Sequence, residues 1–354
     1  MRWVIAGGGT GGHLFPALAL AQRIRARRGE VFFIGCGRRV ETLVLEKPPF
    51  PVAVISGEGL LGRSMWAKAK AVIKLLRGIR EAADLIRGFS ATVVFGTGGY
   101  ASFPVLLAGR LLGKKLGVHE QNAVAGMSNR LAGYLVHRVF VSFPEAERYF
   151  PKGKVIYSGN PIREDLLEER PREHTGKGLL VLGGSQGARS LNRLLVETAE
   201  RLFEKVSGLY LIHQTGERDE AWVKEAYRRK GLSVRVYGFI RDMARAYAQA
   251  DLVVSRAGAT TVAELCALGK PALYIPFPHA THAHQEKNAL SVVRAGGGLM
   301  MREEALDPEE FVRQVAGLLN DRESLKRMGE AAGRLFKPGA ADTIISEMEA
   351  LGNA

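Results

Sequence analysis

The chain has 354 residues, which is enough for two α/β domains of ordinary size. Hydrophobic residues make up 46% of it, so global disorder is excluded. A membrane-spanning helix needs roughly 20 apolar residues, and Arg, Lys or Gly interrupts the longest apolar stretches, such as residues 103–109. The first residues read as a strand entering a glycine turn, which indicates a protein that is not exported. Cys36 and Cys266 lack metal-binding spacing and fit a reducing compartment without disulfides.

The formal charge of +14 lies wholly in the first half of the chain. Residues 1–160 hold 23 Lys and Arg against 9 Asp and Glu, a difference of +14, whereas residues 161–354 hold 27 of each. Such an asymmetry favours an anionic partner: nucleic acid, an acidic membrane surface or a phosphorylated substrate. A merely solubilising surface is the alternative, but solubility gives no reason to charge one half only.

In chain order, the first half predicts strands that alternate with helices. A short apolar strand over 3–6 enters glycines 7–12, and helical spacing follows over 14–28. Such a β-loop-α unit begins a parallel sheet. Further strand-like segments of this half are 31–34, 52–55, 92–95, 115–119, 138–141 and 155–157.

The second half repeats this plan. A strand over 179–182 enters a glycine turn at 183–187, and a helix follows over 191–203. We expect the domain boundary in the turn-rich stretch 157–162, giving domains over 1–160 and 161–339 and a last helix over 340–351. The other strand-like segments are 209–214, 234–237, 252–255 and 272–275. The sequence therefore predicts two doubly wound α/β domains in tandem.

The first glycine loop reads Gly-Gly-Gly-Thr-Gly-Gly-His over residues 7–13. A dinucleotide site also needs an acid after the second strand, which 33–37 lacks, and no Gly-Lys-Ser/Thr follows to make a P-loop. What remains is backbone N–H groups that can approach an anion, with a helix N-terminus behind them. Tight turns without a ligand are the alternative. His13 begins the helix, where its neutral form is favoured, so it is either a general base or a structural histidine.

The stretch of the second half with the most candidate binding groups begins where a strand ends at Ser255. The turn at 257–259 exposes N–H groups, and the helix over 260–268 carries Glu264. A carboxylate one turn into a helix can accept both hydroxyls of a ribose, while the N–H groups bind phosphate. An acid that merely complements the helix dipole is the alternative.

Three histidines, His279, His282 and His284, lie within six residues of one another. This spacing raises a metal site, but the loop is rich in proline and offers no fourth ligand. We therefore predict no bound metal and no other cofactor. A divalent cation that assists a leaving diphosphate from solution stays open.

A basic amphipathic helix is predicted over 67–87, after an apolar loop. Such a helix can lie in a membrane interface, where each basic residue contributes ~1 kcal/mol on anionic lipid. Packing of the apolar face on the sheet is the alternative. Nucleic acid is not a predicted partner, because no groove-reading motif accompanies the charge. The residues assigned to the membrane are Leu60, Leu61, Trp66, Lys68, Lys70, Lys74 and Arg77.

Six motifs in this order resemble the MurG family of bacterial glycosyltransferases, which add N-acetylglucosamine (GlcNAc) to lipid I and make lipid II. The resemblance extends over nearly the whole chain. The motifs are Gly-Gly-Thr-Gly-Gly-His (8–13), Gly-Gly-Tyr (98–100), His-Glu-Gln-Asn (119–122), Gly-Asn-Pro-Ile-Arg (159–163), Gly-Gly-Ser-Gln-Gly-Ala (183–188) and the stretch 251–289.

The resemblance implies a GT-B fold, in which two Rossmann-like domains face a cleft. The first domain would take the acceptor, the second would bind UDP-GlcNAc, and residues 340–354 would return to the first. The implied partners are UDP-GlcNAc, lipid I, an anionic membrane surface and other cell-wall synthesis proteins. The implied location is peripheral, on the cytoplasmic face of the cell membrane. Another GT-B transferase with a different acceptor and a non-catalytic nucleotide-sugar sensor are the alternatives.

The resemblance also assigns individual residues. His13 would be the general base, with Glu120 as second choice or as its support. The loop over 279–284 is not a family pattern, so Gln285 is aligned by the Glu-Lys-Asn-Ala that follows it. The implied binding residues are Glu264 for ribose, the Ile240 backbone for uracil, Ser185, Ala259, Thr260 and Thr261 for the diphosphate, Gln285 and Asn122 for GlcNAc, Arg163 near the phosphates, and Thr10, Gly11 and Gly12 facing the cleft.

Overall fold

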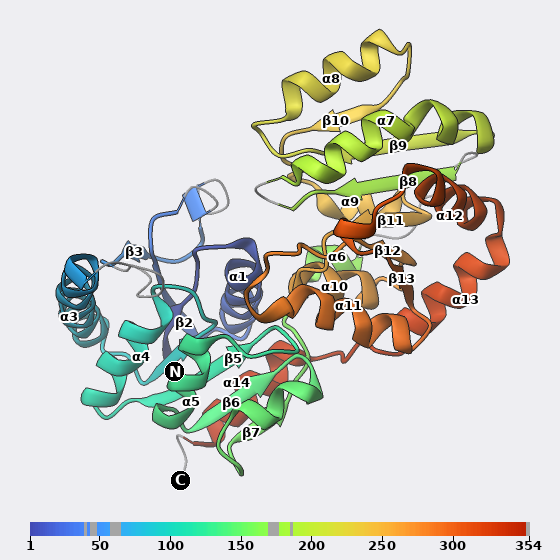
Figure 1. Ribbon diagram of the computed structural model, residues 1–354. Coiled ribbons are helices and arrows are strands. Elements are labelled where there is room, and N and C mark those ends of the chain that lie inside the picture. The colour runs from blue at the N-terminus through green and yellow to red at the C-terminus, as the bar shows by residue number, and fades with distance from the viewer. Residues whose placement is uncertain (39–40, 43–47, 57–64, 169–176, 185–186, 352–354) are drawn as a thin grey trace. The chain divides into compact units, whose positions relative to one another are not determined.

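The computed structural model describes residues 1–38, 41–42, 48–56, 65–168, 177–184 and 187–351, with backbone only for 65–71 and 281 (Figure 1). The chain divides into two compact units. Unit 1 comprises Met1–Arg163 and Lys337–Ala354, and unit 2 comprises Glu164–Phe336. The chain therefore leaves unit 1 after residue 163 and re-enters it at residue 337.

Unit 1 is built on a parallel sheet of seven strands in the order β3-β2-β1-β4-β5-β6-β7. The register pairs Val4 with Phe32 on one side and with Val94 on the other. The sequence predicted all seven strands, because their apolar runs are bounded by glycine and polar turns. The strands are β1 (Arg2–Ala6), β2 (Glu30–Gly35), β3 (Val52–Val54), β4 (Val93–Gly96), β5 (Lys115–Glu120), β6 (Arg138–Val141) and β7 (Val155–Tyr157).

Helices cover both faces of this sheet, as a purely parallel sheet requires. Alternate side chains of the strands point to opposite faces. Val4 and Val94 therefore pack with α3 (Met65–Gly88), α4 (Ser102–Leu111) and α5 (Met127–Leu135), and Trp3 and Ile5 pack with α1 (Gly11–Ala26) and α14 (Ala340–Ala350). A short 3₁₀ helix, Pro144–Tyr149, lies between β6 and β7.

The C-terminal helix α14 belongs to unit 1 although it follows unit 2 in the sequence. Its Ile344, Ile345 and Met348 are buried in the same cluster as Trp3 and Ile5. Asp342 forms ion pairs with Arg23 and Arg27 of the α1 region, each at 2.7 Å. The return of α14 is thus fixed by apolar burial, with charge pairing at its first turn.

Unit 2 contains a second parallel sheet, of six strands in the order β10-β9-β8-β11-β12-β13. The sequence missed the last strand, because three residues that follow paired glycines carry no periodic signal. The strands are β8 (Lys177–Leu182), β9 (Leu209–Gln214), β10 (Arg235–Tyr237), β11 (Leu252–Ser255), β12 (Ala272–Tyr274) and β13 (Gly298–Met300).

Helices flank the second sheet as well, so two doubly wound α/β units are confirmed. One face packs its Leu179, Val181 and Val254 against Leu195 of α7 and Phe311 of α12. The helices of unit 2 are α6 (Glu164–Glu168), α7 (Arg189–Lys205), α8 (Glu220–Arg229), α9 (Met243–Ala248), α10 (Ala259–Ala267), α11 (His284–Arg294), α12 (Pro308–Asn320) and α13 (Arg322–Gly333), with 3₁₀ turns at Thr281–Ala283 and Glu303–Ala305.

The strand order places a functional position in each sheet. The connections change direction between β1 and β4 in unit 1, and between β8 and β11 in unit 2. In open parallel sheets, ligands bind outside the carboxyl ends of the strands at such a switch point. Both glycine loops follow a switch-point strand. The first loop is shorter than expected, because α1 already begins at Gly11.

Candidate functional site

The glycine loop of unit 1 encloses a buried carboxylate that the sequence did not single out. Glu41 accepts hydrogen bonds from the backbone N–H groups of Gly9 at 2.7 Å, Cys36 at 2.9 Å and Gly37 at 2.8 Å. A Cβ on Gly8, whose φ is +146°, would lie 2.2 Å from Glu41 Oε1. Gly9 therefore directs its N–H group inward, to Glu41. Burial and the Glu41 hydrogen bond raise the pKa of the Cys36 thiol to about 12.

His13 lies in the first turn of α1 and is half-buried. The turn after β4 packs against its ring, and a Cβ on Gly98 would lie 2.9 Å from His13 Nδ1. Gly98 and Gly99 have φ values of +93° and +80°, which favour glycine. A Cβ on Gly99 would also come 2.2 Å from the Gly8 carbonyl oxygen. The Gly-Gly-Tyr motif is thus explained by close contact between two switch-point loops.

A chain of hydrogen bonds runs from His13 into the interior of unit 1. His13 Nδ1 lies 2.9 Å from Gln121 Oε1, and Gln121 Nε2 lies 2.9 Å from His119 Nδ1. His119 Nε2 is 2.9 Å from the Gly159 carbonyl oxygen. Burial lowers the pKa of His119 to about 4, so this ring is neutral near pH 7. Residues from three of the six sequence motifs are joined by these hydrogen bonds.

Glu120 is buried and organises the loop after β5. Its carboxylate accepts from the Asn122 backbone N–H at 2.9 Å and the Asn122 amide at 3.1 Å. It also accepts from the Gly126 N–H at 3.0 Å and the Asn129 amide at 2.9 Å. These four bonds occupy the carboxylate, which favours the supporting role over that of a second base. They also fix the position of Asn122.

The remaining predicted residues of unit 1 lie on or beside α1. Thr10 is exposed at the N-cap of α1, and Gly11 and Gly12 form the first helical positions. The Arg163 guanidinium carbon lies 5.4 Å from the centre of the Phe15 ring. That contact holds Arg163 beside α1.

In unit 2, Glu264 lies in the second turn of α10 and is 9% exposed. Its Oε2 accepts a hydrogen bond of 2.8 Å from the hydroxyl of Tyr247, a buried residue of α9. The sequence predicted Glu264 but not Tyr247, which lies 17 residues earlier. The Asn288 amide donates to the Ala257 carbonyl at 3.1 Å and supports the turn before α10.

The three predicted diphosphate contacts at this turn lie in the first turn of α10. Ala259 and Thr260 are buried and Thr261 is half-buried. Helix N-termini offer N–H groups and a favourable dipole to an anion. The position suits a phosphate group.

The second glycine loop follows β8, and its predicted Ser185 lies outside the described residues. The described ends of the loop are bonded to β9: Gly183 N–H donates to the Gln214 carbonyl at 3.1 Å, and the Gln214 amide donates to Gly184 O at 3.1 Å. Ile240 is buried in the segment after β10. The amide oxygen of Gln285 accepts from the Phe277 N–H at 2.9 Å.

Arg256, directly after β11, joins several elements of unit 2 and was not predicted. Its guanidinium donates to the carbonyls of Ile275 at 3.0 Å and Pro276 at 3.2 Å, and to Ser190 Oγ at 3.1 Å. It also pairs with Glu303. The sequence signal that could have identified Arg256 is its position as a charged residue between a strand and a glycine-containing turn.

Among the residues described, no group of three or more His, Cys, Asp and Glu side chains is placed to hold a metal ion. His279 meets the Phe277 ring edge-on, with the ring centres 5.6 Å apart. His282 has a φ of +54°, and His284 begins α11. Independence from a metal stays a prediction.

Comparison with known proteins agrees with this geometry. Residues 3–141 match the family model of the glycosyltransferase family 28 N-terminal domain, and residues 178–344 match that of its C-terminal domain. A UDP-N-acetylglucosamine--N-acetylmuramyl-(pentapeptide) pyrophosphoryl-undecaprenol N-acetylglucosamine transferase of Geobacter sulfurreducens is 40% identical, with 99% of this chain and 98% of the relative covered. A protein of the same name from Desulfotalea psychrophila is 44% identical, with 99% and 97% covered.

The chain belongs to the MurG family. Among solved structures it is similar to MurG of Acinetobacter baumannii, with a TM-score of 0.76, 28% identity and 99% of both chains covered. The resemblance inferred from six motifs is confirmed, and so is the GT-B fold of two Rossmann-like domains. The chain is thus a glycosyltransferase of the UDP-GlcNAc-dependent type.

Proposed function

We propose that the two units perform the two halves of one reaction, acceptor activation in unit 1 and donor binding in unit 2. The chain moves GlcNAc from UDP-GlcNAc to the N-acetylmuramyl sugar of lipid I and forms lipid II for peptidoglycan. Relatives that are 40% and 44% identical over nearly the full chain carry this assignment. In this proposal, the polar groups at the switch point of each sheet bind the donor and activate the acceptor.

The donor would bind at the carboxyl ends of β8 and β11. Glu264, oriented by Tyr247, accepts both ribose hydroxyls, and the backbone of Ile240 meets uracil. The first turn of α10, with Ala259, Thr260 and Thr261, binds the diphosphate through N–H groups and the helix dipole. Ser185 of the second glycine loop adds a hydroxyl there. Gln285 contacts the GlcNAc hydroxyls.

The chemistry would follow from His13. The C4 hydroxyl of the acceptor attacks the anomeric carbon from the face opposite UDP, so the configuration inverts. As the new C–O bond forms, the hydroxyl proton passes to His13, and UDP departs with the electron pair of the broken bond. Arg163 and loop N–H groups near Thr10, Gly11 and Gly12 stabilise phosphate charge. Glu120 acts by holding Asn122 toward the sugar.

Unit 1 would also contact the membrane through three neighbouring helices. Part of the apolar face of α3 packs on the sheet through Ala82 and Ile86. Its Ile73 and Leu76 are nevertheless 66% and 63% exposed, and Leu111 at the end of α4 is 72% exposed. We call the exposed set on α3, α4 and α5 the apolar strip; its members are Val72, Ile73, Leu76, Leu111, Met127, Leu131 and Tyr134.

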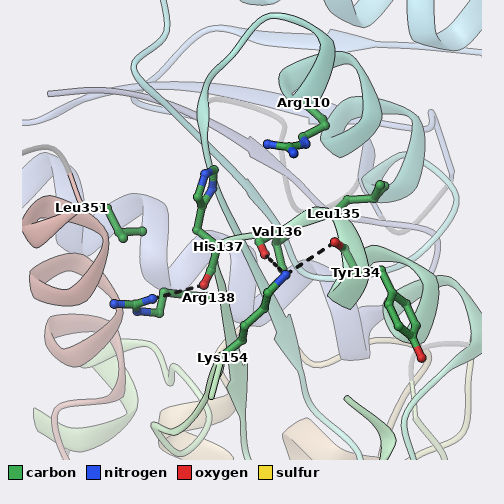
Figure 2. Close-up of a pocket in the computed structure, with 8 residues that line it drawn as sticks. All are labelled: Arg110, Tyr134, Leu135, Val136, His137, Arg138, Lys154 and Leu351. Carbon is green, nitrogen blue, oxygen red and sulfur yellow. Dashed lines mark hydrogen bonds between the residues drawn. The ribbon is translucent and has the colours of Figure 1, made fainter. Parts of the chain in front are cut away.

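Cations lie beside Tyr134, one member of the apolar strip. Arg110, Arg138 and Lys154 line a pocket of about 320 Å³ beside Tyr134 (Figure 2). Lys154 donates to the Val136 carbonyl at 2.9 Å. Basic side chains beside exposed apolar groups suit an anionic lipid surface. Lys74 and Arg77 are further basic residues, on α3 itself. Leu60, Leu61 and the side chains of Trp66, Lys68 and Lys70 lie outside the described residues.

This surface supports a peripheral position at a membrane. We propose that this is the cytoplasmic face of the cell membrane, where other cell-wall synthesis proteins are further candidate partners. In the described part of the chain, none of the helices has the length and apolar character needed to cross a bilayer. No cofactor is needed for the proposed reaction. A divalent cation is proposed only as an aid to the leaving diphosphate, which turnover with and without EDTA tests.

A transfer assay tests the reaction. Purified protein is incubated with UDP-GlcNAc and a short-chain lipid I analogue, and the disaccharide product is followed by mass spectrometry. We expect product with UDP-GlcNAc and none with UDP-glucose. Binding of UDP-GlcNAc without product would overturn the acceptor assignment, and a panel of other lipid-linked and small-molecule acceptors would then be tried.

Vesicle co-sedimentation tests the membrane surface. We expect binding to vesicles that contain phosphatidylglycerol, weaker binding to pure phosphatidylcholine, and loss of binding for Ile73→Asp. Leu335→Asp is the matched control, because Leu335 is an exposed leucine of unit 2. Equal loss for both variants, or binding unaffected by Ile73→Asp, would contradict the proposed surface.

A further inference from the structure

The chain of contacts between His13 and the interior has only one consistent set of proton positions. The Gly159 carbonyl oxygen can only accept, so His119 Nε2, 2.9 Å away, carries a hydrogen. A neutral imidazole has one N–H, so His119 Nδ1 is then an acceptor. Burial keeps His119 neutral, because it lowers the pKa of this ring to about 4.

The orientation of the Gln121 amide is fixed from two sides. Its Nε2 lies 2.9 Å from His119 Nδ1 and 3.1 Å from the His119 carbonyl oxygen. Both neighbours are acceptors, and an NH₂ group has two hydrogens to donate. A flipped amide would place its oxygen against two acceptors. The Gln121 oxygen therefore points toward His13.

His13 completes the sequence of donors and acceptors. Its Nδ1 is 2.9 Å from Gln121 Oε1, which can only accept, so His13 carries its hydrogen on Nδ1. Glycine at position 98 leaves room for this edge of the ring, since a Cβ there would lie 2.9 Å from Nδ1 and from Cε1. The lone pair of neutral His13 is then on Nε2.

We infer that Gln121 is a positioning residue: anchored by His119, it holds His13 in the Nδ1–H tautomer and so makes Nε2 the proton acceptor. This inference rests on the proposed role of His13 as the base. The acceptor hydroxyl gives its proton to Nε2 as its oxygen bonds to the anomeric carbon. The imidazolium that results keeps its Nδ1–H on Gln121, so the ring stays in place during the transfer.

The tautomer can be measured without an activity assay. Protein labelled with ¹⁵N-histidine gives separate signals for the protonated and unprotonated nitrogens of each ring, and the His13 signal is assigned by its absence in His13→Ala. We expect Nδ1–H in the unaltered protein and a mixture of tautomers in Gln121→Met, which has similar size but no hydrogen-bonding amide. Gln214→Met, at the end of β9 in unit 2, is the matched control and should leave the His13 signal unchanged.

Kinetics then test whether Gln121 acts through His13. We expect Gln121→Met to lower kcat about 10- to 100-fold, less than the roughly 10²- to 10⁴-fold cost of losing the general base itself, with the KM for UDP-GlcNAc unchanged. In a His13→Ala background, the same substitution should lower kcat no further. A thermal melt checks that the variants are folded.

Distinct outcomes separate the two hypotheses. An Nε2–H tautomer in the unaltered protein, or an Nδ1–H tautomer that survives in Gln121→Met, would overturn the inference. So would an equal fall of kcat in both backgrounds. Near-normal turnover of His13→Ala would instead remove the base assignment, while the measured tautomer still decides the hydrogen-bond chain.

Discussion

The two glycine loops share a backbone plan but differ in what surrounds them. In unit 1, Glu41 accepts a hydrogen bond from the N–H of Gly9, and His13 lies in the first turn of the helix that follows the loop. Gln121 contacts His13 from the end of β5. In unit 2, the neighbouring strand end opens α10, whose Glu264 is held by the Tyr247 hydroxyl. A strand–glycine–helix unit therefore provides a position for a site, and we propose that the side chains around it determine whether it handles a proton or a sugar nucleotide.

The comparison predicts that unit 1 governs turnover and unit 2 governs donor affinity. The largest effect is expected for His13→Ala, because loss of a general base costs about 10²- to 10⁴-fold in rate. The KM for UDP-GlcNAc should stay unchanged. Steady-state kinetics with the lipid I analogue measure both, and His137→Asn is the control, since His137 lies at the opposite end of the sheet, before β6. A near-normal kcat in His13→Ala would contradict the prediction that unit 1 governs turnover through His13.

Glu264→Gln should act on the donor instead. Loss of a hydrogen bond to a charged group costs about 1.5–3 kcal/mol, which corresponds to about a 10- to 100-fold higher KM for UDP-GlcNAc. Tyr247→Phe removes only the bond that orients Glu264, so an increase of about 2- to 10-fold is expected. Calorimetry with UDP checks the affinity directly. If kcat fell and UDP affinity did not, Glu264 would act in the transfer step and not in donor binding.

Glu41→Gln tests whether the internal carboxylate supports the first loop. A neutral amide cannot replace an oxygen for each of the three N–H donors, so we expect unit 1 to lose about 1–3 kcal/mol of stability. Thermal unfolding followed by circular dichroism measures the loss. Glu30→Gln is the matched control, because Glu30 is an exposed surface acid. Equal melting curves for both variants would show that the first glycine loop keeps its structure without the Glu41 carboxylate.

The smallest expected effect is on the stability of the fold in acid. Here the two units should behave alike, because each holds a buried histidine, His119 in unit 1 and His213 in unit 2. Burial lowers the pKa of His213 in unit 2 to about 3, from an ordinary value of 6.5. The unfolded chain then binds more protons than the folded one between these values, so stability falls as the pH drops through 6.5 toward 3. His213→Gln should flatten this slope in urea unfolding between pH 7 and pH 5. An unchanged slope would remove His213 as a cause.

The strands and the motif residues could be predicted because their signals are local. Glycines mark the strand ends, and apolar spacing marks β1, β8 and the helices behind them. The last strand, Gly298–Met300, is too short to show alternation. The predicted start of α1, residue 14, is three residues later than the observed Gly11, and that of α10, residue 260, is one residue later than the observed Ala259, because glycine and alanine fit both a turn and a first helical turn.

Most partners within the sites could not be predicted, because they are distant in sequence. Gln121 is 108 residues from His13, and Glu41 is 32 residues from Gly9. Only the strand order brings such residues together, since β1, β4 and β5 lie side by side with parallel carboxyl ends. Tyr247 and Arg256 were missed for another reason: a buried hydroxyl or guanidinium resembles an ordinary core or surface residue until its partner is known.

The late return of α14 has a consequence for synthesis. Domains usually fold from the N-terminus onward as the chain leaves the ribosome. Unit 2 is one continuous segment, 164–336, whereas the core of unit 1 remains incomplete until Ile344, Ile345 and Met348 have been made. The second unit can therefore be finished first, while the nascent first unit still exposes the apolar groove that α14 will cover. A chain that ends at residue 336 should therefore fold unit 2 while unit 1 still lacks α14.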